Sequence, residues 1–380
     1  NFAGGRQALY NNWGGCSNTG IGYRALYSNT TGIENVGIGH DVLYYNATGT
    51  GSQAIGRSAL EKNTTGSCNA AIGNYALFNN TTGCYNTAIG FNALKNSLSG
   101  CHNTAIGHQA LNFNWGGCEN QAIGRNALYT NTTGSCNVAL GYQGLFSNTT
   151  GCYNAAIGTE ALYENTTGDH NTAIGCGALK GSLSGSHNFA AGCSALSNNW
   201  GGSNNTAIGR CALLSNCTGY SNFAVGFQSL FLNKAGYQNN AIGPYALYEN
   251  TTGYNNNALG QSALQSNTTG YSNNAFGQHA LTNNTTGSHS FAAGQHALYS
   301  HTTGGYNTAI GWNALRDTTT GYYNVAFGYQ AICGNTTGCD NTAIGNQALK
   351  GSLSGCHNFA AGNRALYSNW GGGHNTAIDQ

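Results

Sequence analysis

The chain has 380 residues, of which only 6% are charged, and its formal net charge is +1. Without a basic patch there is no counterion-release contribution to hold nucleic acid, so nucleic-acid binding is not expected. No apolar run approaches the ~18 residues of a membrane span and no signal peptide opens the chain, so we expect no membrane span in this sequence.

A repeat of seventeen residues organises the sequence from its first residue. Starting at Asn1, the chain divides without insertion or deletion into 22 complete repeats, and the six residues NTAIDQ begin another. The consensus is N-x-A-I-G-x-x-A-L-x-x-N-T-T-G-x-x, whose positions are numbered 1 to 17 below. Positions 5 and 15 are Gly in every complete repeat, and Asp379 in the partial repeat is the exception at position 5. Periods of this kind indicate stacked supersecondary units.

A longer period overlies the first. Repeats with the phrase SLSG begin at Asn86, Asn171 and Asn341, and each is followed by a repeat with NWGG. The first two are five repeats apart, which indicates duplicated blocks and predicts super-repeats at 86–170 and 171–255. We expect one continuous repeat domain over residues 1–380, taken from a longer repeat chain.

Two constant glycines divide each repeat into segments that are too short for helices and contain few strong helix formers. Two short strands joined by two turns would make one rung of a β-solenoid, with rungs stacked about 4.8 Å apart. The sequence therefore predicts an all-β solenoid with 17-residue rungs and 22 complete repeats.

Positions 2 and 4 compensate for each other in size. Where position 2 is Phe, position 4 shrinks, as in Phe189 with Ala191 and Phe223 with Val225. We expect both to point to one face, and we expect that face to be a packed interior, completed by the position-9 leucines on the second strand.

The small residues at positions 3, 5 and 8 would then face outward. They indicate either a tight turn or a second chain packed closely against this face, and the latter predicts a homo-oligomeric rod. The Asn at position 1, replaced only at Ser52 and Ser290, predicts a stacked amide ladder along a turn.

No catalytic or cofactor motif is present: the sequence has no phosphate loop, no HExxH and no dinucleotide fingerprint. Glu160 and Glu164 share a rung, where a solvated pair is the simpler interpretation than an acid/base couple. Stacked histidines, such as His170 with His187, suggest weak metal sites but lack a carboxylate cluster. We therefore expect no enzyme, no cofactor and no metal.

Fourteen cysteines are many for this chain length. Several recur on successive rungs, at a spacing that a disulfide accepts. Disulfides would indicate an oxidising, extracellular setting, whereas the alternative is a small residue tolerated in a turn. The candidate disulfide residues are Cys84, Cys101, Cys118, Cys176, Cys193, Cys339 and Cys356.

Asn-x-Thr sequons recur at position 12. They mark possible glycosylation sites, although N-T-T-G is also favourable turn chemistry. The sequon asparagines are Asn29, Asn46, Asn63, Asn80, Asn131, Asn148, Asn165, Asn216, Asn250, Asn267, Asn284 and Asn335.

The recurrent N-[ST]-x-A-I-G phrase with a following Ala resembles the head repeats of YadA-like trimeric autotransporter adhesins. Similar N-T-A-I-G-x-x-A-L phrases occur in tail-fibre-like and bacterial surface proteins. YadA-type repeats are about three residues shorter, and the extra length here falls in the NTTG region. The resemblance implies a left-handed β-roll, a trimer, a cell-surface location and an adhesive or fibre role.

We therefore expect a non-enzymatic structural or adhesive extracellular fibre protein. Its partners would be other copies of itself and a host or surface receptor or glycan. The alternative is an ice-binding β-solenoid, which requires a regular threonine array on a flat face. The adjacent threonines of NTTG, such as Thr30 and Thr31, fit that array poorly.

Overall fold

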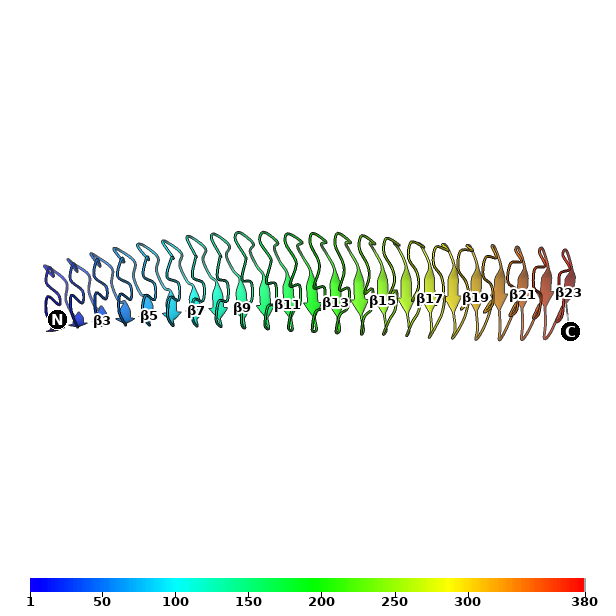
Figure 1. Cartoon of the computed structure of the whole chain (residues 1–380), viewed down its shortest axis with the longest axis horizontal. Helices are drawn as coiled ribbons and strands as arrows, with labels where there is room; N and C mark the ends of the chain where they lie inside the picture. The colour runs from blue at the N-terminus through cyan, green and yellow to red at the C-terminus, as the bar shows by residue number, and fades with distance from the viewer. Residues whose placement is uncertain (379–380) are drawn as a thin grey trace. The chain divides into compact units, whose positions relative to one another are not determined.

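The computed structural model describes residues 1–378, so Asp379 lies outside the described residues. The chain divides into two compact units, unit 1 (residues 1–188) and unit 2 (residues 189–380), each described here by itself. Both are parallel β-solenoids in which one 17-residue repeat forms one rung with a single strand arrow (Figure 1). The predicted all-β solenoid with 22 turns of 17-residue spacing is confirmed. The continuity of the two units as one domain stays a prediction.

Each strand covers positions 2 to 4 of a repeat. The strands of unit 1 are β1 (Phe2–Gly4), β2 (Thr19–Ile21), β3 (Val36–Ile38), β4 (Gln53–Ile55), β5 (Ala70–Ile72), β6 (Thr87–Ile89), β7 (Thr104–Ile106), β8 (Gln121–Ile123), β9 (Val138–Leu140), β10 (Ala155–Ile157) and β11 (Thr172–Ile174). The strands of unit 2 are β12 (Phe189–Ala191), β13 (Thr206–Ile208), β14 (Phe223–Val225), β15 (Asn240–Ile242), β16 (Asn257–Leu259), β17 (Asn274–Phe276), β18 (Phe291–Ala293), β19 (Thr308–Ile310), β20 (Val325–Phe327), β21 (Thr342–Ile344), β22 (Phe359–Ala361) and β23 (Thr376–Ile378).

Neighbouring strands of a unit pair in parallel and without any shift in register. Phe2 lies opposite Thr19 and Thr19 opposite Val36, so each residue faces the one seventeen places later. The same register holds from β12 to β23 in unit 2. Because no repeat gains or loses a residue, identical positions form columns along the stack.

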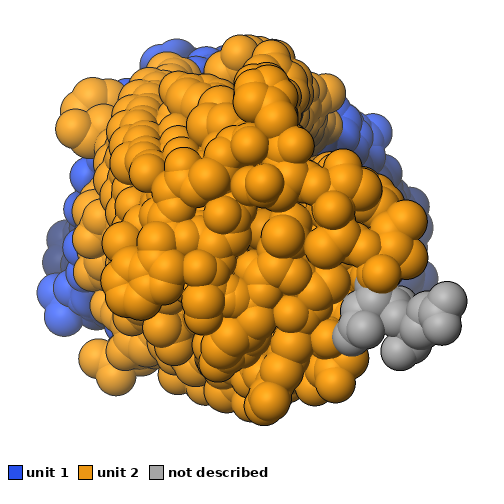
Figure 2. All heavy atoms as spheres, turned by 90° about the vertical axis from the view of Figure 1, so that its right-hand side faces the viewer, with its two compact units in different colours: residues 1–188 blue, residues 189–380 orange. Residues whose placement is uncertain are grey.

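The interior is filled by positions 3, 8 and 9. Ala88, Ala93 and Leu94 of one rung have no exposed surface, and the corresponding residues of nearly all other rungs are equally buried. Figure 2 looks onto the C-terminal end of unit 2, where atoms fill the section without an open channel.

The expected side-chain direction of the strand is wrong. Positions 2 and 4 do share a face, but that face points outward: Ile89 is 38% exposed while Ala88 between Thr87 and Ile89 is buried. The size compensation has a local cause. In the first rung the Phe2 ring lies over position 4, with Cε1 3.5 Å from where a Cβ on Gly4 would stand, so a large residue there would collide with the ring.

The expected second strand is also wrong. Positions 6 to 11 form turns, and positions 7 and 9 have positive φ, for example 54° at both Arg24 and Leu26. This conformation is uncommon for leucine and costs backbone strain. It is stabilised from the next rung, because the Leu26 N–H donates to the Val42 carbonyl at 2.9 Å and the leucine side chain fills the core.

The small residues at positions 3, 5 and 8 pack within the chain itself. The alanines lie inside, and Gly73 at position 5 has φ +132°, where an added Cβ would stand 2.6 Å from the Gly90 carbonyl oxygen of the next rung. The interpretation that a second chain contacts these residues is therefore wrong.

Two buried asparagine ladders fasten the turns. The ladder expected at position 1 is confirmed: the Asn18 backbone N–H donates to Asn1 Oδ1 at 2.8 Å, and Asn18 Nδ2 donates to the Gly32 carbonyl at 2.7 Å. A second ladder runs through position 12, where Asn29 Nδ2 donates to Asn12 Oδ1 at 2.7 Å. Side-chain amides thus join successive rungs at two corners.

Candidate functional site

The outward residues at positions 2 and 4 form what we call the strand face. Its position-4 side chains are mostly isoleucines exposed by about two fifths, such as Ile55 (42%), Ile72 (44%) and Ile123 (41%). No Asp, Glu, Lys, Arg or His occurs at either position in any repeat. The in-register pairing aligns these side chains in columns, so each unit exposes an uncharged, largely apolar strip.

Exposed apolar residues also occur at position 13, on the NTTG turn. Where this position is Thr, its hydroxyl donates to the next rung, as Thr30 Oγ1 does to the Ala47 carbonyl at 2.8 Å. In the SLSG and NWGG repeats it is Leu or Trp instead, and Leu98 and Trp115 are 46% and 54% exposed. These side chains recur with the super-repeat rather than in every rung.

The candidate disulfide cysteines are thiols in the structure. At position 16 their sulfurs accept backbone N–H groups of the preceding rung, as Cys101 Sγ does from Cys84 at 3.2 Å and Cys118 Sγ from Cys101 at 3.2 Å. Serine and aspartate fill the same role elsewhere, for example Asp169, which accepts from the Cys152 N–H at 2.7 Å. A small acceptor thus serves this column in many rungs but is not required there, since Ile33 and Tyr237 occupy the same position in others.

Only some of these thiols are placed for oxidation. The sulfurs of Cys339 and Cys356 lie 2.8 Å apart, and the hydrogen bond with Cys356 raises the pKa of Cys339 to about 12. Cys176 and Cys193 belong to different units and are exposed. A disulfide between Cys339 and Cys356 stays a prediction, which the mass of the non-reduced protein would test.

The stacked histidines lie face to face. The rings of His170 and His187 are 4.8 Å apart and 4° from parallel, and those of His357 and His374 are 4.9 Å apart. Ring nitrogens bind metals in the ring plane, so stacked rings point their lone pairs along parallel lines instead of toward a common ion. Among residues 1–378 no three His, Cys, Asp or Glu side chains form a group that could hold a metal.

The sequon asparagines are buried, and the structure argues against their glycosylation in the folded chain. Asn63 and Asn148 have no exposed surface, and the other ten are equally buried. Asn63 Nδ2 already donates to Asn46 Oδ1 at 2.7 Å and to the Gly66 carbonyl at 2.8 Å. A glycan on this nitrogen would require the ladder to open, so the sequons are structural turn residues.

Glu160 pairs with Lys180 across the rungs, with Oε2 and Nζ 2.6 Å apart. The segment from residue 1 to residue 378 contains no helix able to span a bilayer. No known protein family model matches the chain, and a search of curated proteins finds no significant relative.

Proposed function

We propose that the chain is a non-enzymatic structural protein of an extracellular fibre or filament, in which solenoids of this sequence associate with one another through the strand face. The observation that carries the proposal is the uncharged column of outward apolar side chains at position 4, which are mostly isoleucines in unit 1 and a mixture of Ile, Ala, Val, Leu and Phe in unit 2. The resemblance to surface adhesin repeats supports the extracellular location, the adhesive role and a trimeric or higher assembly.

The strand face exposes more apolar surface than a soluble monomer ordinarily does. At about 40% exposure each isoleucine leaves roughly 70 Å² accessible, so the nine position-4 isoleucines of unit 1 expose roughly 630 Å². A standard protein interface buries about 800 Å² on each partner, which this strip approaches before position 2 is counted.

A second copy of the same chain is the partner that fits this surface best. Its own side chains repeat at the same spacing, about 4.9 Å between stacked rings such as Tyr27 and Tyr44. One favourable packing of isoleucine against isoleucine is therefore repeated along the stack. A partner with a different spacing could not repeat the same side-chain contact from one rung to the next.

Charges placed on the strand face test the proposal. In the double variant Ile123→Lys/Ile157→Lys, two lysines would have to lose their hydration at the interface. We expect sedimentation velocity and electron microscopy to show assemblies of the unchanged protein and only monomers of the variant. Both side chains point outward, so circular dichroism should show the solenoid fold retained.

The matched control is Thr133→Lys/Thr167→Lys, which adds the same charges to exposed turn residues of the same two rungs. It should assemble like the unchanged protein. Equal loss of assembly in both variants would show a general charge effect, and unchanged assembly in the strand-face variant would overturn the proposed interface.

One observation bears on the ice-binding alternative. Position 14 is an exposed threonine in six successive rungs of unit 2, from Thr252 to Thr337. The neighbouring position-13 hydroxyl is used inside the solenoid, as in Thr268 Oγ1 to the Thr285 carbonyl at 3.0 Å, so this turn presents one free row rather than two. Thermal hysteresis of the purified protein would favour ice binding over the structural proposal.

A further inference from the structure

A hollow of about 470 Å³ lies on the surface of unit 2. It forms where positions 7, 10 and 11 of the rung with His296 and Tyr299 meet positions 6, 7, 10 and 11 of the next rung. Its volume is within the range of small-molecule sites, about 300–1000 Å³. Because repeats differ at these positions, its composition is particular to these two rungs.

Aromatic rings supply part of the lining. Trp312 is 39% exposed, and Tyr329 of the following rung stacks on one of its faces at 4.9 Å. No other ring among the described residues contacts Trp312, so its second face has no aromatic partner. Tyr299 lies edge-on to His296, at 5.3 Å and 81°. The hollow therefore offers flat apolar surfaces.

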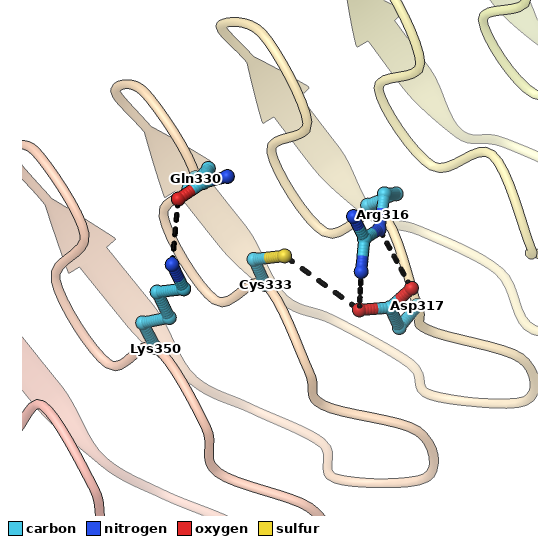
Figure 3. Close-up of polar contacts among 5 residues, drawn as sticks. All are labelled: Arg316, Asp317, Gln330, Cys333 and Lys350. Carbon is cyan, nitrogen blue, oxygen red and sulfur yellow. Dashed lines mark hydrogen bonds and ion pairs between the residues drawn. The ribbon is translucent and has the colours of Figure 1, made fainter.

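The polar groups of the lining are neutral as a set. Arg316 donates from Nε and Nη2 to the two carboxylate oxygens of Asp317 at 2.8 and 2.9 Å, and the Cys333 thiol reaches Asp317 Oδ2 at 3.6 Å (Figure 3). Burial, followed by the charges of His279 and Arg316, lowers the pKa of His296. Arg316 keeps unused N–H donors, and the carboxylate keeps unused acceptor capacity.

Asn313 adds a group that has no partner inside the protein. Its side chain lines the hollow and is only 4% exposed, and its Oδ1 atom accepts no hydrogen bond. A buried carbonyl oxygen without a donor is disfavoured, so a hydroxyl group in the hollow would be held by it. Asn92 and Asn126, which also stand at position 7, leave Oδ1 without a partner too, so what distinguishes the hollow is this acceptor together with the aromatic rings.

We propose that this hollow binds a neutral saccharide ring. A pyranose has C–H faces that pack on aromatic rings. Its hydroxyls can donate hydrogen bonds to Asn313 Oδ1 and the Asp317 carboxylate and accept them from the unused N–H groups of Arg316. An anionic ligand such as a phosphate fits less well because Asp317 already neutralises Arg316.

The test is saturation-transfer NMR on the full chain with methyl glucoside, methyl mannoside and methyl galactoside, together with retention on polysaccharide-coated beads. The free glycosides and the beads distinguish an isolated sugar from a surface glycan. We expect binding in at least one arm, and a roughly tenfold weakening in each of Trp312→Ala and Asn313→Ala. Thermal melting of both variants would show that they remain folded.

Trp200→Ala is the matched control, since Trp200 is an exposed tryptophan on an NWGG turn of unit 2, and it should bind like the unchanged protein. Absence of binding in both arms, or binding unaffected by Trp312→Ala, would each overturn the proposal. Assembly is measured separately: the Trp312→Ala variant should still assemble, so this inference and the proposed fibre function fail independently.

Discussion

The carbonyl oxygen of the position-15 glycine joins the two asparagine ladders. Gly32 O accepts from Asn18 Nδ2 at 2.7 Å and from Asn29 Nδ2 at 2.9 Å. Where position 12 is not Asn, the position-12 ladder stops and the last asparagine loses its donor. Asn80 Oδ1 has no partner because the next rung has Ser97, and Asn284 Oδ1 has none because the next rung has His301. Each interruption places unpaired polar atoms in a buried column, which is destabilising.

His301 makes one interruption sensitive to pH. It is buried, with Nε2 2.8 Å from the Gly304 carbonyl and Nδ1 without a partner, and burial lowers its pKa to about 4. Between this value and the unfolded value of about 6.5, the unfolded chain binds more protons. The free energy of unfolding should therefore fall as the pH drops from about 6.5 toward 4, by up to about 3 kcal/mol.

Melting temperatures at pH 7 and pH 4.5 would measure this effect. The variant His301→Asn should melt higher at both values, because it continues the ladder, and should lose less stability on acidification. The difference between the two proteins isolates His301 from the other histidines. An equal loss in both proteins would contradict the assignment.

Adjacent alanines of β18 test the side-chain direction within a strand. Ala292 points inward and is fully buried, whereas Ala293 lies on the strand face. Ala292→Val should overpack the interior and lower the free energy of unfolding by about 1–3 kcal/mol. Ala293→Val should change it by less than about 0.5 kcal/mol, because the chain already places a valine beside a position-2 Phe at Val225. The reverse order in thermal unfolding would restore the interior assignment of positions 2 and 4.

At the scale of the rung, the sequence is enough to predict the repeat, the parallel stacking and the position-1 ladder, because all three follow from a period without insertions. The direction of the strand is not predictable in this way. Phe2 and Gly4 compensate in size on an outward face as readily as they would in a core, because the Phe2 ring lies over its neighbour.

Two other features escaped prediction for identifiable reasons. Leucine rarely adopts a positive φ, as Leu26 does here. Ordinary backbone preferences therefore predict a strand at positions 8 to 10, where the chain forms turns. Asn63 matches a glycosylation sequon, which conceals its role in the ladder. The hollow beside Trp312 depends on side chains from neighbouring rungs, and no single repeat reveals it.

The two adjacent glycines of the NWGG turn differ in how much space a side chain would have. At Gly117 an added Cβ would overlap the Gly134 carbonyl oxygen and stand 2.6 Å from Asn114 Oδ1, whereas at Gly116 its nearest neighbour is Ser99 Oγ at 3.9 Å. Gly117→Ala should therefore cost about 3 kcal/mol or more, and Gly116→Ala about 1 kcal/mol or less. Chemical denaturation would compare them, and similar costs would show that the position-15 glycine is not required by the ladder.

At the scale of whole compact units, a solenoid has contacts only between neighbouring rungs, so its stability is a sum of local terms. In unit 2 the position-12 ladder is continuous from Asn199 to Asn284, with each amide 2.7–2.8 Å from the next. It is interrupted at His301 and at Thr318, whose Oγ1 atom has no partner. The same rungs form the hollow at Trp312.

Hydrogen exchange should therefore vary along unit 2 rather than follow one global opening. Amides of residues 290–340 should exchange sooner than those of residues 216–284, because local opening breaks fewer favourable contacts there. Mass spectrometry of peptides from the two segments would measure the difference. The double variant His301→Asn/Thr318→Asn completes the ladder and should slow exchange in 290–340 while leaving 216–284 unchanged. Uniform exchange, or a variant that protects neither segment, would show that the amide ladder does not determine where the solenoid opens.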